Sequence, residues 1–328
     1  MRHVQTRFRA PLAASLATLA LAGTAEAQCP DAFPLQNYSA GQQQACPCFV
    51  PGEQAGATFQ APESHYPIEI TRVRITYGSV FGGSGQSLEE AIHLYEGGLP
   101  NPGAPIFSLP APVLTDGFVN EFDISIIPGS KVIQSGPFTV ALEYFSQSAG
   151  SAFAPAVVLD SNGCQAGKNP TFVIPGGWTD GCALGISGDW EIQVVYRRAL
   201  CASPGSISLS AGGAQSYVLS AGSDRAGEIY WIVGSATGTS PGLTGSGVTL
   251  PLNYDVYMQF TLDLPNLWIA NSLNFLDAQG QSTASLTFPA AFDPTLAGLQ
   301  LHHAYVVLDT APITPIFASN AQPLTLVP

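Results

Sequence analysis

Residues 238–242 read Gly-Thr-Ser-Pro-Gly and fit the G-x-S-x-G pattern of a serine hydrolase nucleophile. Acidic and histidine residues follow in the chain order of an α/β-hydrolase triad, and they are Asp277, Asp293, His302 and His303. A nucleophile elbow requires a strand that turns sharply into a helix, whereas Pro241 follows this serine and a Gly-rich stretch comes next. We therefore interpret the segment as a β-turn loop and predict no catalytic residue.

A second segment has the residue types of a calcium site. Residues 160–163 read Asp-Ser-Asn-Gly, which places the oxygen-bearing side chains of Asp160 and Asn162 at alternate positions before a glycine. Asp180 or Asp189 would complete the oxygen shell for Ca²⁺. The distal bidentate glutamate of an EF-hand loop is absent, and turns rich in Asp and Asn are common in β proteins. A plain turn therefore stands beside the calcium site as an alternative interpretation.

One tryptophan allows a glycan-binding hypothesis. Trp178 lies in the sequence Pro-Gly-Gly-Trp-Thr-Asp, residues 175–180, which is typical of a loop and would leave the ring exposed. Sugar rings stack on flat aromatic faces and hydrogen-bond to neighbouring carboxylates, here that of Asp180. The competing interpretation is that Trp178 plugs one end of the β-structure. Trp190 continues into an alternating strand, so we expect it in the core.

The cysteine count predicts disulfides. All six cysteines lie in the first 201 residues, at Cys29, Cys46, Cys48, Cys164, Cys182 and Cys201. An even number in an exported chain favours oxidation. We expect Cys164 to pair with Cys182 across a Gly-rich loop, and the other four cysteines to tie the N-terminal segment to the end of the first domain. A zinc site at residues 46–48 is the alternative, although paired zinc ligands are usually spaced more widely.

The adjacent histidines His302 and His303 lie in an apolar alternating run. Neighbouring residues of a strand point to opposite faces, so the two imidazoles cannot readily share one metal ion. His303 has the phase of Leu301 and Tyr305, which predicts a hydrogen-bonded histidine in the core.

The N-terminus has the layout of a secretory signal peptide. Arg2, Arg7 and Arg9 precede a mostly apolar stretch at residues 10–22, and Ala-Glu-Ala at residues 25–27 forms a small-x-small exit. The apolar stretch is shorter than the roughly 20 residues that a membrane-spanning helix needs. We expect cleavage near Ala27 and a secreted or periplasmic product with no membrane span.

Charge narrows the range of partners. The chain has 23 acidic and 10 basic residues, and only 10% of all residues are charged. An acidic surface repels phosphate backbones, so we expect no nucleic-acid partner. Polysaccharide or envelope components, and self-association through sheet edges, remain as expected partners.

Hydrophobic periodicity predicts an all-β protein. Apolar residues alternate with polar ones at residues 122–126, 138–144 and 190–196, which indicates strands with one buried face. The 34 glycines and 27 prolines leave little room for helices, and only residues 87–91 resemble a helical turn. Between residues 68 and 77 the apolar phase changes, which predicts a β-bulge near Thr71 and Arg72. Further strands are expected around residues 207–211, 217–221, 229–233, 256–262 and 299–307.

The length of 328 residues suggests two domains. We expect a signal peptide at 1–27, a Cys-containing segment at 28–60 packed on the first domain, and a β-sandwich at 61–201. The first domain would be a jelly roll or a related sandwich with disulfides. A second β-sandwich would follow at 206–328, after a Pro- and Gly-containing break.

Four segments of the second domain, at residues 230–242, 250–255, 276–280 and 303–307, resemble a β-rich module found at the C-terminus of uncharacterised exported bacterial proteins. The resemblance implies export and a β fold, and it assigns no activity and no site residue. It covers roughly residues 206–328.

The sequence therefore favours a non-catalytic exported protein, either structural or ligand-binding, with a glycan as one ligand class. The alternative is a secreted hydrolase of glycan or ester bonds, whose site would be assembled from residues far apart in the chain.

Overall fold

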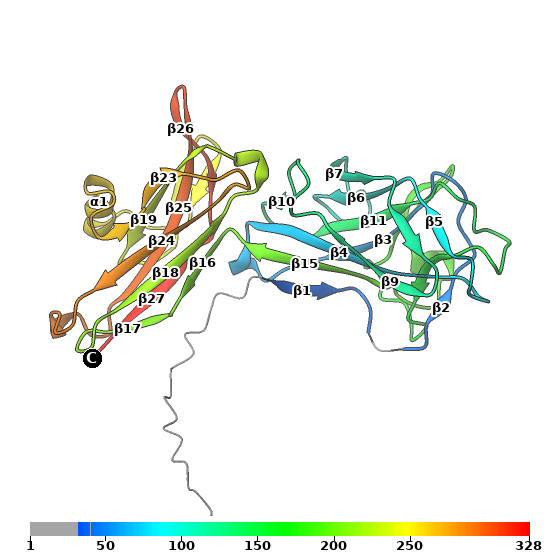
Figure 1. The fold of residues 1–328 in the computed structure, drawn as a ribbon, viewed down its shortest axis with the longest axis horizontal. Helices are drawn as coiled ribbons and strands as arrows, with labels where there is room; N and C mark the ends of the chain where they lie inside the picture. The colour runs from blue at the N-terminus through cyan, green and yellow to red at the C-terminus, as the bar shows by residue number, and fades with distance from the viewer. Residues whose placement is uncertain (1–31, 40) are drawn as a thin grey trace, which may run out of the picture.

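The computed structural model describes residues 32–39 and 41–328, and the expected signal peptide and Cys29 lie outside them. The chain is nearly all β, with several sheets, two complete disulfides among the described residues and one short α-helix, which confirms the predicted fold class. Figure 1 shows two sets of sheets side by side along the long axis, the first built from blue to green strands and the second from green to red ones.

The first set holds two main sheets that share one hydrophobic core. The seven-stranded sheet has the order β1-β15-β4-β12-β2, with β9 and β10 also paired to β4. Its strands are β1 (Phe33–Gln36), β15 (Ile192–Arg198), β4 (Ile68–Gly78), β12 (Ala156–Leu159), β2 (Gln44–Ala45), β9 (Phe118–Asp123) and β10 (Val132–Ile133). The six-stranded sheet runs β14 (Gly177–Asp180), β13 (Pro170–Val173), β3 (Gln54–Phe59), β11 (Phe138–Glu143), β6 (Ala91–Tyr95) and β7 (Pro105–Pro110). A small hairpin pairs β5 (Gln86–Leu88) with β8 (Val113–Thr115).

The alternation of apolar residues in the sequence correctly locates core residues of this set of sheets. Trp190, Ile192 and Val194 are fully buried, as their alternation predicts, and Trp190 packs against Phe49 with ring centroids 5.3 Å apart. Strand β3 lies between β13 and β11. Residues 54–59, which we expected in a segment packed on the first domain, are therefore interior to its sheet.

The predicted β-bulge is present at Thr71. Val195 pairs with Arg72 while the next residue, Tyr196, pairs with Ile70, so Thr71 is the extra residue of β4. Its hydroxyl donates to the carbonyl of Val195 at 3.1 Å. This contact gives the unpaired residue a hydrogen-bonding partner inside the sheet.

The second set also holds two main sheets around one core. The four-stranded sheet runs β16 (Leu200–Ser203), β18 (Gly213–Ser220), β24 (Gln281–Phe288) and β22 (Ile269–Ala270). The six-stranded sheet runs β17 (Ser206–Ser208), β27 (Gln322–Val327), β25 (Gln300–Thr310), β19 (Ile229–Ser235) and β23 (Leu273–Phe275), with β26 (Ile313–Ala318) paired to β25. A hairpin joins β20 (Leu243–Gly245) to β21 (Val248–Leu250), and four 3-10 turns complete the described chain at η1 (Glu63–His65), η2 (Gly181–Leu184), η3 (Ser223–Arg225) and η4 (Pro294–Leu296).

The strand expected around residues 256–262 is wrong, because this segment forms helix α1 (Val256–Asp263). The Asp255 side chain accepts a hydrogen bond from the backbone N–H of Met258 at 2.8 Å, which is the geometry of an N-cap. Met258 and Thr261, three positions apart, form the buried face, and Val256 is 87% exposed. The alternating apolar residues therefore do not share one face.

Two smaller expectations are also wrong. Residues 87–91 form no helical turn, because β5 ends at Leu88 and the buried Glu89 carboxylate accepts hydrogen bonds from the N–H of Phe145 and of Ser146. The alternation expected to reach Ile126 stops at Asp123, whose carboxylate accepts the N–H of Ser125 in a tight turn. Ile126 is consequently 80% exposed.

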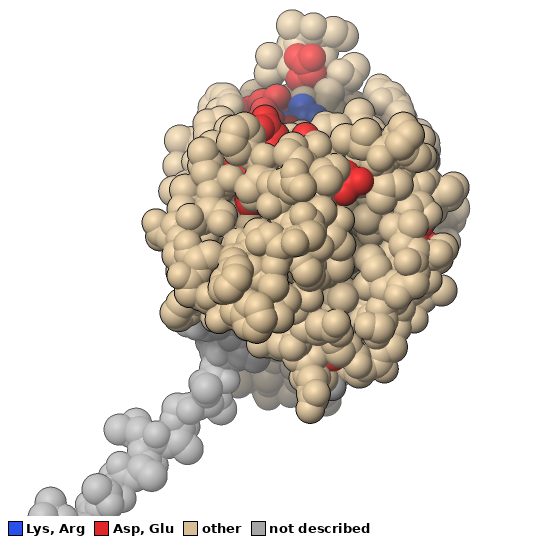
Figure 2. Space-filling view, turned by 90° about the vertical axis from the view of Figure 1, so that its right-hand side faces the viewer, with Lys and Arg blue, Asp and Glu red and all other residues tan. Residues whose placement is uncertain are grey.

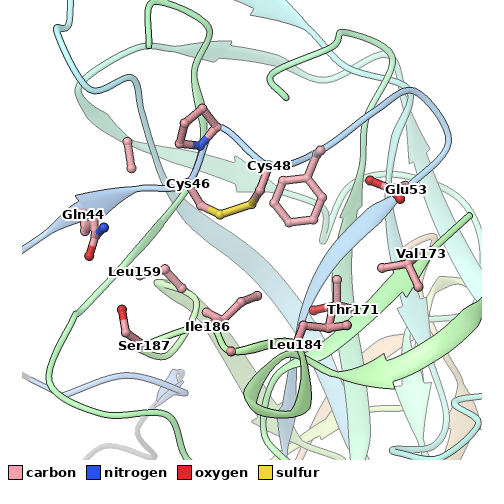
Figure 3. Close-up of a pocket in the computed structure, with 14 residues that line it drawn as sticks. Gln44, Cys46, Cys48, Glu53, Leu159, Thr171, Val173, Leu184, Ile186 and Ser187 are labelled. Carbon is pink, nitrogen blue, oxygen red and sulfur yellow. A yellow bond between two sulfur atoms is a disulfide. The ribbon is translucent and has the colours of Figure 1, made fainter. Parts of the chain in front are cut away.

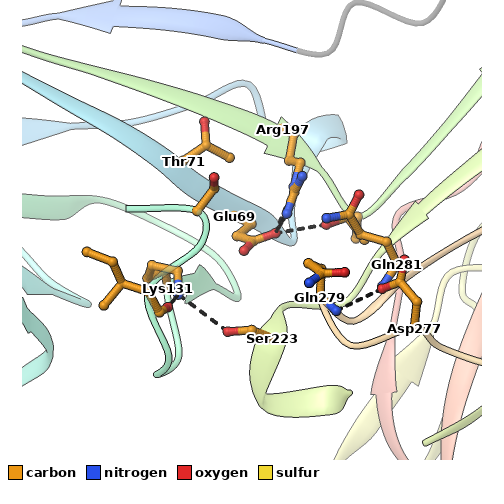
Figure 4. A network of polar contacts seen from close by, with 12 residues as sticks. Glu69, Thr71, Lys131, Arg197, Ser223, Asp277, Gln279 and Gln281 are labelled. Atoms are coloured by element: carbon orange, nitrogen blue, oxygen red, sulfur yellow. Dashed lines mark hydrogen bonds and ion pairs between the residues drawn. The ribbon is translucent and has the colours of Figure 1, made fainter. Parts of the chain in front are cut away.

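A buried ion pair within the first set is hydrogen-bonded to the second set (Figure 4). Glu69 on β4 is 1% exposed, and its Oε2 accepts from the guanidinium of Arg197 and from the hydroxyl of Ser220 on β18, each at 2.8 Å. Lys131, also 1% exposed, donates to the carbonyls of Ile127 and Gly129 and lies 3.5 Å from the Ser223 hydroxyl. These polar contacts are accompanied by an apolar one, because Val132 of β10 packs in the hydrophobic core of the second set. No helix in the described part of the chain is long and apolar enough to cross a membrane.

Candidate functional site

A pocket of about 450 Å³ opens in the first set of sheets (Figure 3). Segments that are far apart in the sequence build it, namely residues 44–49 and 53, residue 159, two residues of β13, and residues 184–187 at the end of η2. The Cys46–Cys48 disulfide forms one wall and the side chains of Leu184 and Ile186 lie opposite it. The volume falls within the roughly 300–1,000 Å³ of small-molecule sites.

Aromatic packing holds the disulfide side of the pocket in place. Phe49 stacks on Tyr144 with ring centroids 4.3 Å apart, and its backbone N–H donates to the hydroxyl of Ser148 at 3.1 Å. Phe49 is 2% exposed, so the segment between β2 and β3 that carries it is anchored in the core. The disulfide that precedes it therefore has a fixed position.

The opposite side of the pocket is held by η2 and the second disulfide. The Asp180 side chain accepts the N–H of Cys182 at 3.1 Å and caps η2. Gly185 ends the turn with φ 82°, in the left-handed region that favours glycine. The Cys164–Cys182 disulfide ties this turn to the preceding loop, as the sequence predicted.

The pocket lining carries one charged side chain, that of Glu53, and its carboxylate oxygens already accept hydrogen bonds from backbone N–H groups. Glu53 is 9% exposed, with Oε2 accepting the N–H of Val50 at 3.0 Å and Oε1 accepting the N–H of Ile174 at 3.1 Å. The other polar side chains are the amide of Gln44 and the hydroxyls of Thr171 and Ser187. The pocket thus offers uncharged hydrogen-bonding groups next to apolar ones.

The pairing of the remaining cysteines differs from the expected one. Cys46 and Cys48 bond to each other, so they do not tie the N-terminal segment to the end of the first domain. Both sulfur atoms are used in this bond, which removes the zinc alternative at these residues. Cys201 is disulfide-bonded as well, and the expected role of Cys29 lies outside the described residues.

The residues of the calcium hypothesis are partly brought together, and donors occupy their oxygen atoms. Asp160 and Asp189 are both fully buried. Asp160 accepts the N–H of Ser39 at 3.0 Å and that of Asp189 at 2.9 Å. Asp189 accepts the N–H of Gln165 at 2.7 Å and the side-chain amide of Asn169 at 2.6 Å. Because N–H groups point at the oxygens that a cation would need, this arrangement fits carboxylates that order loops.

The other two members of the calcium hypothesis have their own partners. Asn162 donates to the Ser39 hydroxyl at 2.7 Å, and the second carboxylate oxygen of Asp180 accepts the N–H of Gly167 at 2.6 Å. Among the described residues, one group of Cys and acidic side chains is close enough to hold a metal ion, namely Cys164, Asp180 and Cys182. Its two sulfurs are bonded to each other, so the group does not fit a metal ion.

Trp178 lies in strand β14 and not in a loop, and its ring is half-buried. It packs edge-on against Tyr95 at 5.3 Å and against Phe172 at 5.5 Å between ring centroids. The Gly-rich residues before it form the hairpin turn between β13 and β14. Trp178 is absent from the pocket lining, as are Asp160, Asp180 and Asp189. None of these sequence-predicted residues therefore lines this pocket.

The histidine and serine motifs are placed largely as expected. His303 is fully buried on β25, and its Nε2 is 2.9 Å from the hydroxyl of Tyr257, while Nδ1 has no hydrogen-bond partner among the described residues. Burial, reinforced by the neighbouring His302, lowers the pKa of His303 to about 3. Residues 238–242 lead into β20, with no helix after the serine.

Comparison of the chain with protein-family models and with curated proteins gives no match.

The sequence did not predict this pocket, because the residues that line it form no motif. The Cys-Pro-Cys segment at 46–48 is the one sequence signal at this site.

Proposed function

We propose that this is an exported binding protein whose pocket beside the Cys46–Cys48 disulfide takes a small uncharged ligand, with a neutral oligosaccharide as the favoured class. The pocket itself, of about 450 Å³ with fixed walls, is the observation that carries the proposal. Disulfides are typical of oxidising compartments outside the cytoplasm, which supports export.

The lining determines the ligand chemistry. The Gln44 amide and the Ser187 hydroxyl, both on exposed residues, offer donors and acceptors, as sugar hydroxyls require. The Thr171 hydroxyl is buried and already donates to the carbonyl of Asn169. The disulfide and the apolar side chains present a surface for the apolar face of a sugar ring. A cationic ligand would find the Glu53 carboxylate already hydrogen-bonded to two backbone N–H groups. An anionic ligand would meet an acidic protein.

The test is a binding screen of neutral, anionic and cationic oligosaccharides followed by calorimetry on the best ligand. Leu184 is 50% exposed at the pocket, so Leu184→Trp would fill the space without disturbing the core. We expect this variant to weaken binding at least about tenfold. Leu267→Trp, at a site 65% exposed and outside the lining, is the matched control and should leave binding unchanged.

A Trp178→Ala variant separates the pocket from the stacking hypothesis. Trp178 contributes nothing to the pocket lining, so its removal should leave affinity within about twofold. If Trp178→Ala abolishes binding while Leu184→Trp does not, the glycan site is the aromatic face of β14 and the pocket proposal is wrong.

Self-association is a second candidate, because the end of the first set of sheets carries few charged side chains (Figure 2). Two aromatic side chains of this set, Phe81 and Phe153, are 68% and 66% exposed, with ring centroids 5.1 Å apart. Exposed apolar patches mark contact surfaces. Light scattering coupled to size-exclusion chromatography would report a dimer or a larger assembly if this surface is used, and a monomer would exclude it.

A further inference from the structure

Three side chains from neighbouring strands form a continuous hydrogen-bonded chain on one face of the six-stranded sheet of the first set. The hydroxyl of Ser108 on β7 is 2.7 Å from Nδ1 of His93 on β6. Nε2 of the same imidazole is 2.7 Å from Oε2 of Glu143 on β11. The pairing of the strands fixes this order, because Ser108 lies directly opposite His93 and β11 flanks β6 on its other side.

The partners define the direction of the hydrogen bonds. An ionised carboxylate can only accept, so Glu143 requires the proton of neutral His93 to be on Nε2. Nδ1 then carries the lone pair, and the Ser108 hydroxyl must donate to it. A serine that donates to an imidazole oriented by a carboxylate is the arrangement that activates a nucleophile.

The surroundings keep the base ordered and the serine accessible. The side chains of His93 and Glu143 are 13% and 25% exposed, whereas Ser108 is exposed. The amide of Gln54 lies 3.4 Å from Oε2 of Glu143, and its oxygen accepts the Tyr95 hydroxyl at 2.8 Å. The carboxylate is thereby also held from β3, a fourth strand.

This chain of residues is separate from the pocket. On β13, Thr171 and Val173 line the pocket, whereas Phe172 between them points to the opposite face. Phe172 pairs with Gln54, which contacts Glu143, so Glu143 lies on that opposite face. The two sites therefore lie on opposite sides of the sheet, so a ligand in the pocket leaves Ser108 open.

We propose that Ser108, His93 and Glu143 form an acyl-transfer site that hydrolyses small, uncharged carboxylic esters. Ser108 Oγ attacks the ester carbonyl while its proton moves to His93 Nδ1. The alkoxide then leaves as an alcohol by taking that proton, and an acyl-serine remains. Water attacks the acyl-serine, gives its proton to His93 and releases the acid, and Ser108 regains its proton. Glu143 stays ionised as a positioning residue.

The expected rate is modest. A positioned general base contributes about 10²–10⁴-fold, and the site is open to water. Turnover of an activated p-nitrophenyl ester is therefore the suitable readout, together with covalent labelling by a fluorophosphonate. In the labelling reaction an O–P bond forms at Ser108, the P–F bond breaks, and fluoride leaves while His93 takes the proton.

The experiment labels the mature protein with the fluorophosphonate and locates the adduct by mass spectrometry. We expect one adduct, at Ser108, that disappears in Ser108→Ala and falls at least about 100-fold in rate in His93→Gln. Ser206→Ala, at an exposed strand serine on β17, is the matched control and should label as the unmodified chain does. Glu143→Gln should slow labelling and shift its pH profile, and Glu143→Asp should restore part of the rate.

Two results would overturn the proposal. The first is labelling that fails to select Ser108, so that the adduct is spread over several exposed serines or does not form at all. In this case the labelled sample should have the same melting midpoint as the untreated protein, which shows that the protein is folded. The second is ester turnover that survives Ser108→Ala, because this would make His93 or another group the nucleophile.

Discussion

Asp160 and Asp189 hold each other's backbone: the N–H of Asp189 donates to Oδ1 of Asp160 at 2.9 Å, and the N–H of Asp160 donates to the carbonyl of Asp189 at 3.2 Å. Because the remaining donors at these carboxylates are also protein N–H groups, we predict that a calcium chelator leaves the melting midpoint unchanged. A fall in the midpoint that added Ca²⁺ restores would instead establish the calcium site expected from the sequence.

The same pair predicts the effect of a mutation. Asp189→Asn places an amide NH₂ among the N–H donors of Gln165 and Asn169, and a buried donor without an acceptor costs about 1–3 kcal/mol. Urea unfolding should therefore show a loss of about 2 kcal/mol. Asp263→Asn, at an exposed position in α1, is the control and should change stability by less than about 0.5 kcal/mol.

Glu69 is ion-paired within the first set of sheets and is hydrogen-bonded to Ser220 of the second set, so its removal should weaken both the first set and the contact between the sets. Glu69→Ala removes the partner of Arg197 and of the Ser220 hydroxyl, and breaking a buried ion pair costs about 3–5 kcal/mol. Arg197 keeps some contact with solvent, so we expect the lower end of this range. In the variant, the unfolding transitions of the two sets of sheets, each monitored separately, should no longer coincide. Coincident transitions with undiminished stability would contradict a structural role for this contact.

Acid should destabilise the protein through His303. Its folded pKa is about 3, below the ordinary value of 6.5, so between these two pH values the unfolded chain binds a proton and the folded one does not. The contribution of His303 to stability is therefore constant above about pH 6.5, and it falls by up to about 1.4 kcal/mol per pH unit toward pH 3. Burial also lowers the pKa of His65 and His302, which adds to the slope.

His303→Gln isolates the contribution of this histidine. Urea unfolding at several pH values between 4 and 7 should show a shallower slope in the variant, whatever the loss of stability at pH 7. An unchanged slope would mean that His303 is protonated in the folded state.

The two complete disulfides should differ in their effect on stability. Cys164 and Cys182 are 18 positions apart, and closing such a loop stabilises by about 3 kcal/mol in the chain-entropy model. Cys46 and Cys48 are two positions apart, so the corresponding figure is about half as large. Double serine variants of each pair, compared by chemical denaturation, test this ranking. Equal losses for the two pairs would show that loop closure is not the dominant contribution.

The fold was largely predictable where burial has period two. The alternation around Trp190 places the core strand β15, and the phase change in β4 locates the bulge at Thr71. Both inferences hold because side chains of a strand alternate between faces whatever the sheet partners are. Helix α1 escaped prediction because Asp255, which caps it, lies outside the alternating run that was used to assign the segment.

The candidate sites were hardly predictable, because sheet pairing brings their residues together. His93 and Ser108 are 15 positions apart, and Glu143 follows His93 by 50. No local pattern marks them, since each stands singly in an ordinary strand. Trp178 shows the converse case: glycine-rich neighbours suggested a loop, yet they form the turn of a hairpin that packs the ring against Tyr95 and Phe172.

The pocket is tested most directly by a crystal structure of the mature protein with the oligosaccharide that binds best in the screen. The account predicts density for a sugar ring between the Cys46–Cys48 disulfide and Leu184, with hydroxyls hydrogen-bonded to Gln44 or Ser187. Density over Trp178, or an empty pocket at saturating ligand, would contradict it.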